Sequence, residues 1–430
     1  MSKLVRHENW SLGSNNVAGR AQLPVDRGVR SVREAVNVDI MNGGEFRGRI
    51  GYEQVVSVAS PRGLVGLGTV LFYADGTALK KHDLNTRTTT TAATIPGYGE
   101  LAGAVHAGEL FMCVAGTMLR YDGTDLRTWG VPTVYTQPPC TVTATPGLNR
   151  VAAGDYEYAV TVVNAWGEES GTMRSGTLTL SDSSTLQFTG LPTPPTDGSV
   201  RLYVSTLSGT TKYLQAETTA ATVSLSNLTT DGMVLETQFM REPPAGTIIA
   251  SYHGVLLIAD GQTLWVTQPM RPHLIDMSAG WFQYPTAITN VLPVEDGVYV
   301  TADKTYFLTG IELDTPEQRT LQDFGAVARS GVQFGDKVAW MTEYGQAIGQ
   351  RGGQMELPNR NFYAPLLATK AAAGIVRTNG LETIVTALRE PPERNSLAAA
   401  DFYDSDIILV GAAAEGVTIT DSFTAEVIDP

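Results

Sequence analysis

Residues 254–267 read GVLLIADGQTLWVT: a glycine, a short apolar strand, an Asp-Gly turn and a second strand. This pattern predicts a β-hairpin, because Asp-Gly between two apolar runs favours a tight turn. Four more copies keep the same order. They begin at Gly68 (GTVLFYADGTALKKH), Gly108 (GELFMCVAGTMLRY), Gly297 (GVYVTADKTYFLTG) and Gly335 (GDKVAWMTEYGQAIG). A recurring hairpin is an internal repeat, and such a repeat decides the fold class.

The spacing of the copies is the second indication. Gly68 and Gly108 are 40 residues apart, Gly254 and Gly297 are 43 apart, and Gly297 and Gly335 are 38 apart. A period near 40 with several short strands in each unit is typical of propeller blades. We therefore predict an all-β fold based on a β-propeller of about six blades, with five or seven as alternatives.

The gap of 146 residues between Gly108 and Gly254 indicates an insertion. One blade period accounts for part of it, and the remainder is the size of a β-sandwich of roughly 100 residues. Proline clusters flank a segment in which seven short strands alternate apolar and polar residues. These strands begin at Cys140, Tyr156, Thr177, Thr185, Val200, Lys212 and Ala221. We predict an inserted immunoglobulin/fibronectin type III-like β-sandwich, since residues 156–170 resemble the long central strand and turn of a fibronectin type III domain.

Three domains follow from this arrangement. Residues 1–131 hold an N-terminal segment and the first blades, 132–243 the inserted sandwich, and 244–430 the remaining blades and the ring closure. Strand patterns after residue 372 predict a sixth blade, and the early strand in 35–52 could pair with it so that no sheet edge stays open. Residues 316–328 (PEQRTLQDFGAVA) predict a short helix.

Charge argues against a general nucleic-acid-binding surface. The net charge is −14, whereas phosphate affinity depends on clustered Lys and Arg. Residues 1–50 carry eight Lys/Arg and five Asp/Glu, a net +3, which leaves −17 for residues 51–430. The basic segment is either a set of solvated arginines or an edge that docks on an acidic neighbouring subunit.

The sequence predicts a protein that is not an enzyme, with no catalytic residue, cofactor or metal. Its five histidines form neither HxH nor HExxH, its two cysteines form no CxxC motif, and GxSxG does not occur. Asp260 and Gly261 only partly match the repeated turn of sialidases and are interpreted as a hairpin turn. His106 and His253 each precede a repeat hairpin, at positions interpreted as equivalent, which predicts a role in the turn. Cys113 is predicted to be buried, and Trp166 to be a cap or an exposed contact.

Targeting and membrane segments are not evident in the sequence. Residues 1–8 lack the apolar core of a signal peptide, and the apolar stretch at 407–414 is too short to span a bilayer. We therefore expect no membrane span and assembly in a cytoplasm.

The N-terminal segment resembles the opening of tail proteins from short-tailed bacteriophages. The resemblance lies in NNVA at 15–18, LP at 23–24, REAVNVDI at 33–40 and GGEFRGRIGY at 43–52. Residues 200–205 (VRLYVS), with Gly209 and Tyr213, resemble strands of the sandwich inserted in those proteins. The proteins that the segment resembles belong to the tail nozzle or tail stabilisation group.

The resemblance implies a virion structural protein of the phage tail. Such proteins form a cyclic ring, hexameric in this prediction, below the portal and adaptor proteins, extend the DNA channel, and anchor fibres or a needle. Genomic DNA would pass an acidic wall without sequence-specific binding. Two alternatives stay open: a receptor- or glycan-binding, even glycan-cleaving, tail propeller, and a tail-tip component of a long-tailed phage.

Overall fold

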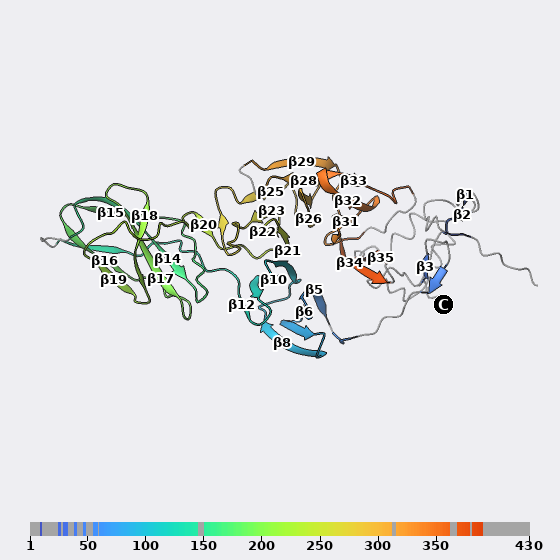
Figure 1. The fold of residues 1–430 in the computed structure, drawn as a ribbon, viewed down its shortest axis with the longest axis horizontal. Helices are drawn as coiled ribbons and strands as arrows, with labels where there is room; N and C mark the ends of the chain where they lie inside the picture. Colours follow the sequence, from blue (N-terminus) through green and yellow to red (C-terminus); the bar gives the residue numbers. More distant parts are fainter. Residues whose placement is uncertain are drawn as a thin grey trace, which may run out of the picture. The chain divides into compact units, whose positions relative to one another are not determined.

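The computed structural model describes residues 9–10, 25–26, 29–32, 38–40, 46–48, 55–58, 60–144, 150–311, 315–361, 368–378 and 381–389. Within these ranges the fold is all-β and propeller-like, built from small antiparallel sheets with one short 3-10 helix, η2 (Arg351–Gly353) (Figure 1). The chain divides into two compact units, residues 58–283 and residues 1–57 with 284–430. No helix in the described ranges is long and apolar enough to cross a membrane.

The unit of residues 58–283 contains three four-stranded sheets whose strands pair in chain order. Blade A is β5 (Pro61–Leu67), β6 (Val70–Asp75), β7 (Ala78–Asp83) and β8 (Thr88–Thr94). Blade B is β9 (Ala102–His106), β10 (Glu109–Val114), β11 (Thr117–Tyr121) and β12 (Leu126–Thr128). Blade C is β21 (Ile248–Tyr252), β22 (Val255–Asp260), β23 (Thr263–Val266) and β25 (Trp281–Gln283).

The other unit contains two more sheets of this kind. Blade D is β26 (Asn290–Val294), β27 (Gly297–Thr301), β28 (Thr305–Thr309) and β29 (Glu317–Gln322). Blade E is β30 (Val332–Phe334), β31 (Lys337–Thr342), β32 (Gly345–Gly349) and β33 (Met355–Glu356). Three two-stranded hairpins accompany them: β1 (Val25–Asp26) with β2 (Val29–Arg30), β3 (Val38–Ile40) with β4 (Phe46–Gly48), and β34 (Lys370–Thr378) with β35 (Leu381–Arg389).

The five predicted repeat hairpins are confirmed, and each supplies the two central strands of one blade. Strand β10 explains why these strands are apolar throughout. Leu110, Met112 and Val114 pack on blade A, while Phe111 and Cys113 pack on blade C. Since successive side chains of a strand point to opposite faces, a strand covered on both faces needs an unbroken apolar run. Blades D and E pack in the same way through Tyr299 and Trp340.

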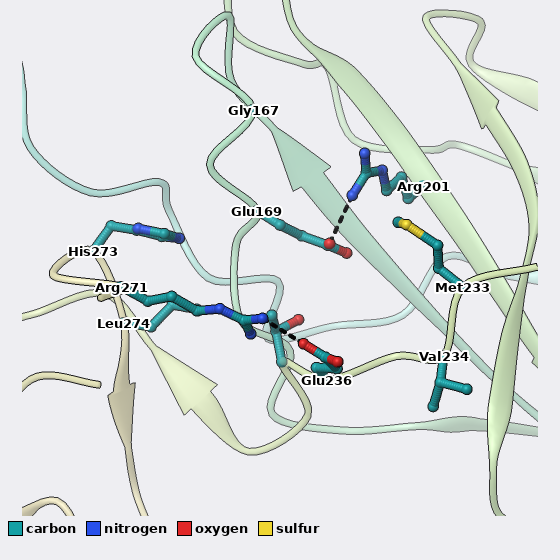
Figure 2. A pocket seen from close by; sticks show the side chains of 10 residues that line it. Gly167, Glu169, Arg201, Met233, Val234, Glu236, Arg271, His273 and Leu274 are labelled. Atoms are coloured by element: carbon teal, nitrogen blue, oxygen red, sulfur yellow. Dashed lines mark hydrogen bonds and ion pairs between the residues drawn. The ribbon is translucent and has the colours of Figure 1, made fainter. Parts of the chain in front are cut away.

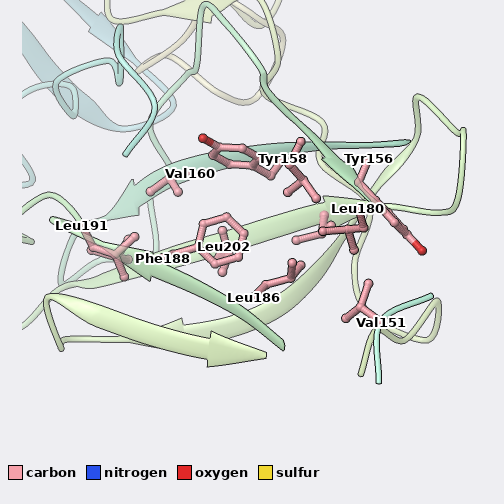
Figure 3. Packing of buried hydrophobic residues seen from close by; sticks show 12 residues of the cluster. Val151, Tyr156, Tyr158, Val160, Leu180, Leu186, Phe188, Leu191 and Leu202 are labelled. Atoms are coloured by element: carbon pink, nitrogen blue, oxygen red, sulfur yellow. The ribbon is translucent and has the colours of Figure 1, made fainter. Parts of the chain in front are cut away.

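The segment between blades B and C folds as a two-layer sandwich, and all seven predicted strands are present. One sheet has the order β13 (Cys140–Ala144), β16 (Ser184–Thr189), β19 (Thr222–Leu225). The other has the order β15 (Gly176–Leu180), β14 (Gly154–Val163), β17 (Ser199–Ser205), β18 (Lys212–Thr218). Tyr158 of β14 meets Phe188 of β16 edge to face, 5.0 Å between ring centroids, in a core that contains only sandwich residues (Figure 3).

The strand order of this sandwich differs from that of a constant-type immunoglobulin domain. There the first two strands are neighbours in one sheet. Here β13 pairs with β16, and β14 lies in the facing sheet. Two further short strands, β20 (Met240–Arg241) and β24 (Ile275–Asp276), pair with each other beyond the sandwich.

Two sequence predictions need correction. The helix predicted at 316–328 is wrong: β29 occupies residues 317–322 and pairs with β28, so sheet pairing overrides a weak local preference for helix. His106 and His253 are not equivalent. His106 ends β9 opposite Glu109, a place held in blade C by Tyr252 opposite Val255, while His253 lies in the following turn at φ 39°.

The ring closure stays a prediction. The N-terminal motif residues fall mostly outside the described ranges, as do residues 390–430. The described parts of these regions are the hairpins β3–β4 and β34–β35, whose strands pair only within each hairpin among the described residues. Five blades are described, against about six predicted.

Candidate functional site

A short loop after β14 carries the sandwich side of the candidate site. Asn164 stabilises this loop: its Oδ1 accepts hydrogen bonds from the backbone N–H groups of Trp166 and Glu168, both at 3.0 Å. Its Nδ2 donates to Oε2 of Glu168 at 2.7 Å. The N–H of Ser170 returns to the carbonyl of Val162 at 2.8 Å and closes the loop. An Asn side chain that satisfies a turn in this way fixes the direction of the residues it encloses.

The loop places Glu168 and Trp166 against two arginines of blade B. Arg120 of β11 forms ion pairs with Glu168 and with Glu109 of β10. Arg127 of β12 lies 3.8 Å from Glu109, and its guanidinium lies 4.5 Å from the ring centroid of Trp166. The charged side chains are only 10–22% exposed. Because they are shielded from water, these pairs interact more strongly than surface ion pairs do.

Trp166 has both of the roles that the sequence predicted as alternatives, a cap and an exposed contact. It caps Arg127, and it is 56% exposed. Two nitrogens of Arg127, Nε and Nη1, are buried without a hydrogen-bond partner among the described residues, and the guanidinium lies over the indole face. A cation over an indole contributes about 0.5–2 kcal/mol, depending on how far it is desolvated.

Glu169 points the other way and anchors a second set of charges. Its Oε1 accepts hydrogen bonds from Thr161 Oγ1 at 2.5 Å and from the Tyr203 hydroxyl at 2.8 Å. Its Oε2 accepts from Arg201 Nη1 at 2.9 Å, and Arg201 Nε donates to Glu217 Oε2 at 3.0 Å. Burial raises the pKa of Tyr203, and the neighbouring Glu169 carboxylate raises it further, so this hydroxyl stays protonated and donating.

Between these groups and blade C lies a cavity of about 510 Å³. Figure 2 shows the Glu169–Arg201 pair on one side and the Glu236–Arg271 pair on the other, with His273 at the edge. The remaining lining residues are Gly167, Met233, Val234, Thr237 and Leu274. The cavity therefore lies where the sandwich loop meets the loop between β23 and β24.

His273 is the buried titratable group of this cavity. Its Nδ1 lies 4.0 Å from Glu168 Oε1, and the residue is 8% exposed. Burial lowers the pKa of His273; the charge of Glu168 opposes this, and Arg120 and Arg271 add to it. The imidazole is therefore neutral at pH 7, since its ordinary pKa is about 6.5.

The ion pairs at this site connect the sandwich loop to blade B. Glu109, Glu168, Glu169 and Glu236 each form an ion pair with an arginine. In the part of the chain that the structure describes, no three His, Cys, Asp or Glu side chains are grouped to hold a metal ion. We call the contacts of Glu109, Arg120, Arg127, Glu168 and Trp166 the charged joint.

The sequence predicted no site residue, and the joint was missed. Arg120 and Arg127 are two charged residues in the short strands of blade B. Glu168 lies in the predicted turn of residues 156–170, to which the sequence assigns no contact. Charged residues inside a repeat hairpin are the one sequence signal that could have pointed to them. Cys113 was predicted correctly as buried, at 2% exposure, and burial raises its pKa to about 11. Asp260 and Thr263 flank the predicted hairpin turn of blade C.

Comparison with known proteins shows similarity to solved structures but assigns the chain to no family. No family model and no curated protein matches the chain. Among solved structures it is similar to BBS1N in complex with ARL6DN, at 11% identity and a TM-score of 0.32, over 79% of this chain and 93% of that one. It is also similar to the N-terminal domain of Nup159, at 12% identity and a TM-score of 0.27, over 76% and 72%. The tricorn protease matches at 12% identity and a TM-score of 0.23, over 73% and 27%.

Proposed function

We propose that this chain is a structural protein of a bacteriophage tail, of the nozzle or tail stabilisation type. In this proposal the blades form the body of each subunit and close as a propeller of about six. The inserted sandwich, a variant of the immunoglobulin/fibronectin type III class, is a contact module held by the charged joint. Subunits assemble into a cyclic, hexameric ring that extends the DNA channel below the portal and adaptor.

The charged joint is the observation that carries the proposal. A contact module that transmits force between neighbours needs a fixed attachment, and Glu168 bridges the sandwich to blade B through desolvated ion pairs. The resemblance of residues 15–52 to phage tail proteins supplies the class of particle. The net charge of −17 outside the first 50 residues suits a channel along which DNA slides, because an acidic wall repels phosphates.

Native mass measurement of the full chain, alone and with portal and adaptor proteins of the same particle, tests the proposal. We expect a closed ring with a single stoichiometry, which joins portal–adaptor complexes and not unrelated rings. A chain that stays monomeric under all these conditions overturns the proposal. Labelling of the sandwich in electron micrographs of particles then tests its place in the virion tail and its expected neighbours, the tail fibres or needle.

A receptor- or glycan-binding role is the second candidate, and the cavity is the feature in its favour. Its volume lies in the range of small-ligand pockets. Its lining has no Trp, Tyr or Phe, the residues on which sugars stack, and its carboxylates are paired with arginines. Incubation with host polysaccharide and a reducing-end assay separates the candidates: turnover that Glu169→Gln abolishes would favour the glycan-cleaving one.

A further inference from the structure

The outer strands of the five described blades differ in how well they are protected. Strands β12 and β25 have three residues and β33 has two, whereas β8 has seven and β29 has six. An outer strand presents unpaired N–H and C=O groups that can pair with another chain. Natural sheets limit this by short edges, charged side chains, proline or bulges. The three short strands use the first of these devices, and β8 and β29 do not.

Strand β8 has almost no protection. Its sequence, TTTTAAT, contains no charged residue and no proline, and Thr88–Thr91 are all exposed. A bulge between Leu79 and Lys80 affects only the far end of its pairing with β7. Two cations lie beside it: Arg87, exposed in a left-handed turn at φ 55°, and Lys80, whose Nζ donates to Thr91 Oγ1 at 2.8 Å. The edge residues are neutral, and no described strand pairs with their outer side. The charged residues next to them include Arg87, Lys80 and, opposite Thr88, Asp83 of β7.

Strand β29 is an outer strand whose charge is opposite to that beside β8. Its first four residues are exposed, and Glu317 begins it. Asp323 follows its last residue, is 88% exposed, and accepts a hydrogen bond from Lys304 Nζ at 2.8 Å. The one cation within it, Arg319, is folded back onto its own blade. Arg319 Nη2 donates to the carbonyl of Gly352 at 2.7 Å, and its guanidinium lies 5.8 Å from the ring centroid of Phe307. An acid therefore stands at each end of the strand.

We propose that β8 pairs edge to edge with β29 of a second copy of this chain. The inference rests on the proposed ring and names the surfaces that build it. A contact between two different patches is head-to-tail, which is the kind that closes rings. Arg87 meets Glu317 if the strands run parallel and lies near Asp323 if they run antiparallel. Pairing of β8 with itself would leave β29 open and give Arg87 no acidic partner.

Disulfide trapping tests the contact in the full chain. One preparation carries Thr90→Cys in β8, and another carries Thr320→Cys in β29, the residue opposite Thr90 in both the parallel and the antiparallel register; each is oxidised alone and as a mixture. We expect a crosslinked dimer in the mixture and none in either preparation alone, because residues directly opposite in paired strands have Cβ atoms about 5 Å apart. Thr128→Cys, at the exposed residue of the short outer strand β12, is the matched control and should not crosslink with Thr320→Cys.

Assembly is the second readout. Thr88→Glu with Thr90→Glu places two negative charges opposite the acidic edge β29 without touching a blade core, and we expect at least about a tenfold weaker association. An intact ring in this variant, together with no crosslink in the mixture, overturns the inference while leaving the proposed ring in place. A crosslink in the Thr90→Cys preparation alone also overturns it, in favour of self-pairing. A wild-type chain that forms neither ring nor crosslink overturns the ring and the inference together.

Discussion

Thr133 and Glu242, which are 109 residues apart in the chain, hydrogen-bond each other where the sandwich leaves and rejoins the blades. The N–H of Thr133 donates to Glu242 Oε2 at 3.0 Å, and the N–H of Glu242 donates to Thr133 Oγ1 at 3.1 Å. The side chains also pair directly. The insertion is therefore closed at its base, one residue inside the predicted bounds of 132 and 243.

Loss of this closure should loosen the base of the sandwich. Glu242→Ala leaves two buried donors of Thr133 without an acceptor, and we expect a loss of about 1–3 kcal/mol in the free energy of unfolding. Urea denaturation followed by tryptophan fluorescence measures the loss. Glu236→Ala, which removes a carboxylate from an exposed ion pair with Arg271, is the control and should change stability by less than about 1 kcal/mol.

Glu168 should contribute more to stability than Glu217, an acid in the Arg201 ion-pair cluster. In Glu168→Ala, Arg120 loses an ion pair whose two side chains are 16% and 12% exposed, and we expect a cost of about 1–3 kcal/mol. Glu217 is 43% exposed, so water screens its ion pair with Arg201 and Glu217→Ala should cost less. Hydrogen exchange of residues 164–170 reports the same difference. Equal effects of the two substitutions would contradict a special role of the joint.

Stability should fall as the pH falls through the titration of His273. Burial holds the folded-state pKa of His273 below its ordinary value of 6.5, so between these two pKa values the unfolded chain binds a proton that the folded chain does not. The free energy of unfolding therefore declines as the pH drops below about 6.5 and levels off below the folded-state pKa. His106 acts in the same direction, because burial lowers its pKa too.

The measurement is urea denaturation at pH 7.5 and pH 5.0 for the wild type and for His273→Gln. The variant should lose less stability between the two pH values. His106→Gln is the matched comparison, since His106 lies between blades B and C, with its Nδ1 2.9 Å from Ser251 Oγ, and away from the cavity. An unchanged pH dependence in His273→Gln would show that His273 does not titrate as proposed.

The core of the sandwich and the core of the blades should unfold in separate transitions. Phe188→Ala removes a fully buried ring from the sandwich core, and Phe72→Ala removes one from the core shared by blades A and B. Each should cost about 3–5 kcal/mol. Because the two clusters share no residue, we expect Phe188→Ala to lower one melting transition in calorimetry and Phe72→Ala another. A single transition shifted equally by both would indicate one cooperative unit.

The sequence by itself determined the hairpins, the blade period and the seven strands of the sandwich. Each depends on residues close together in the chain: alternating side chains, apolar runs such as β10, and turns such as Gly261-Gln262. The tertiary structure alone decided the strand order of the sandwich, the strand at Glu317–Gln322 where a helix was predicted, and the one-residue offset between His106 and His253. It also decided the charged joint. Arg120 meets Glu168, 48 residues later, because the sheets stack in a way that local periodicity does not encode, and burial makes that contact strong.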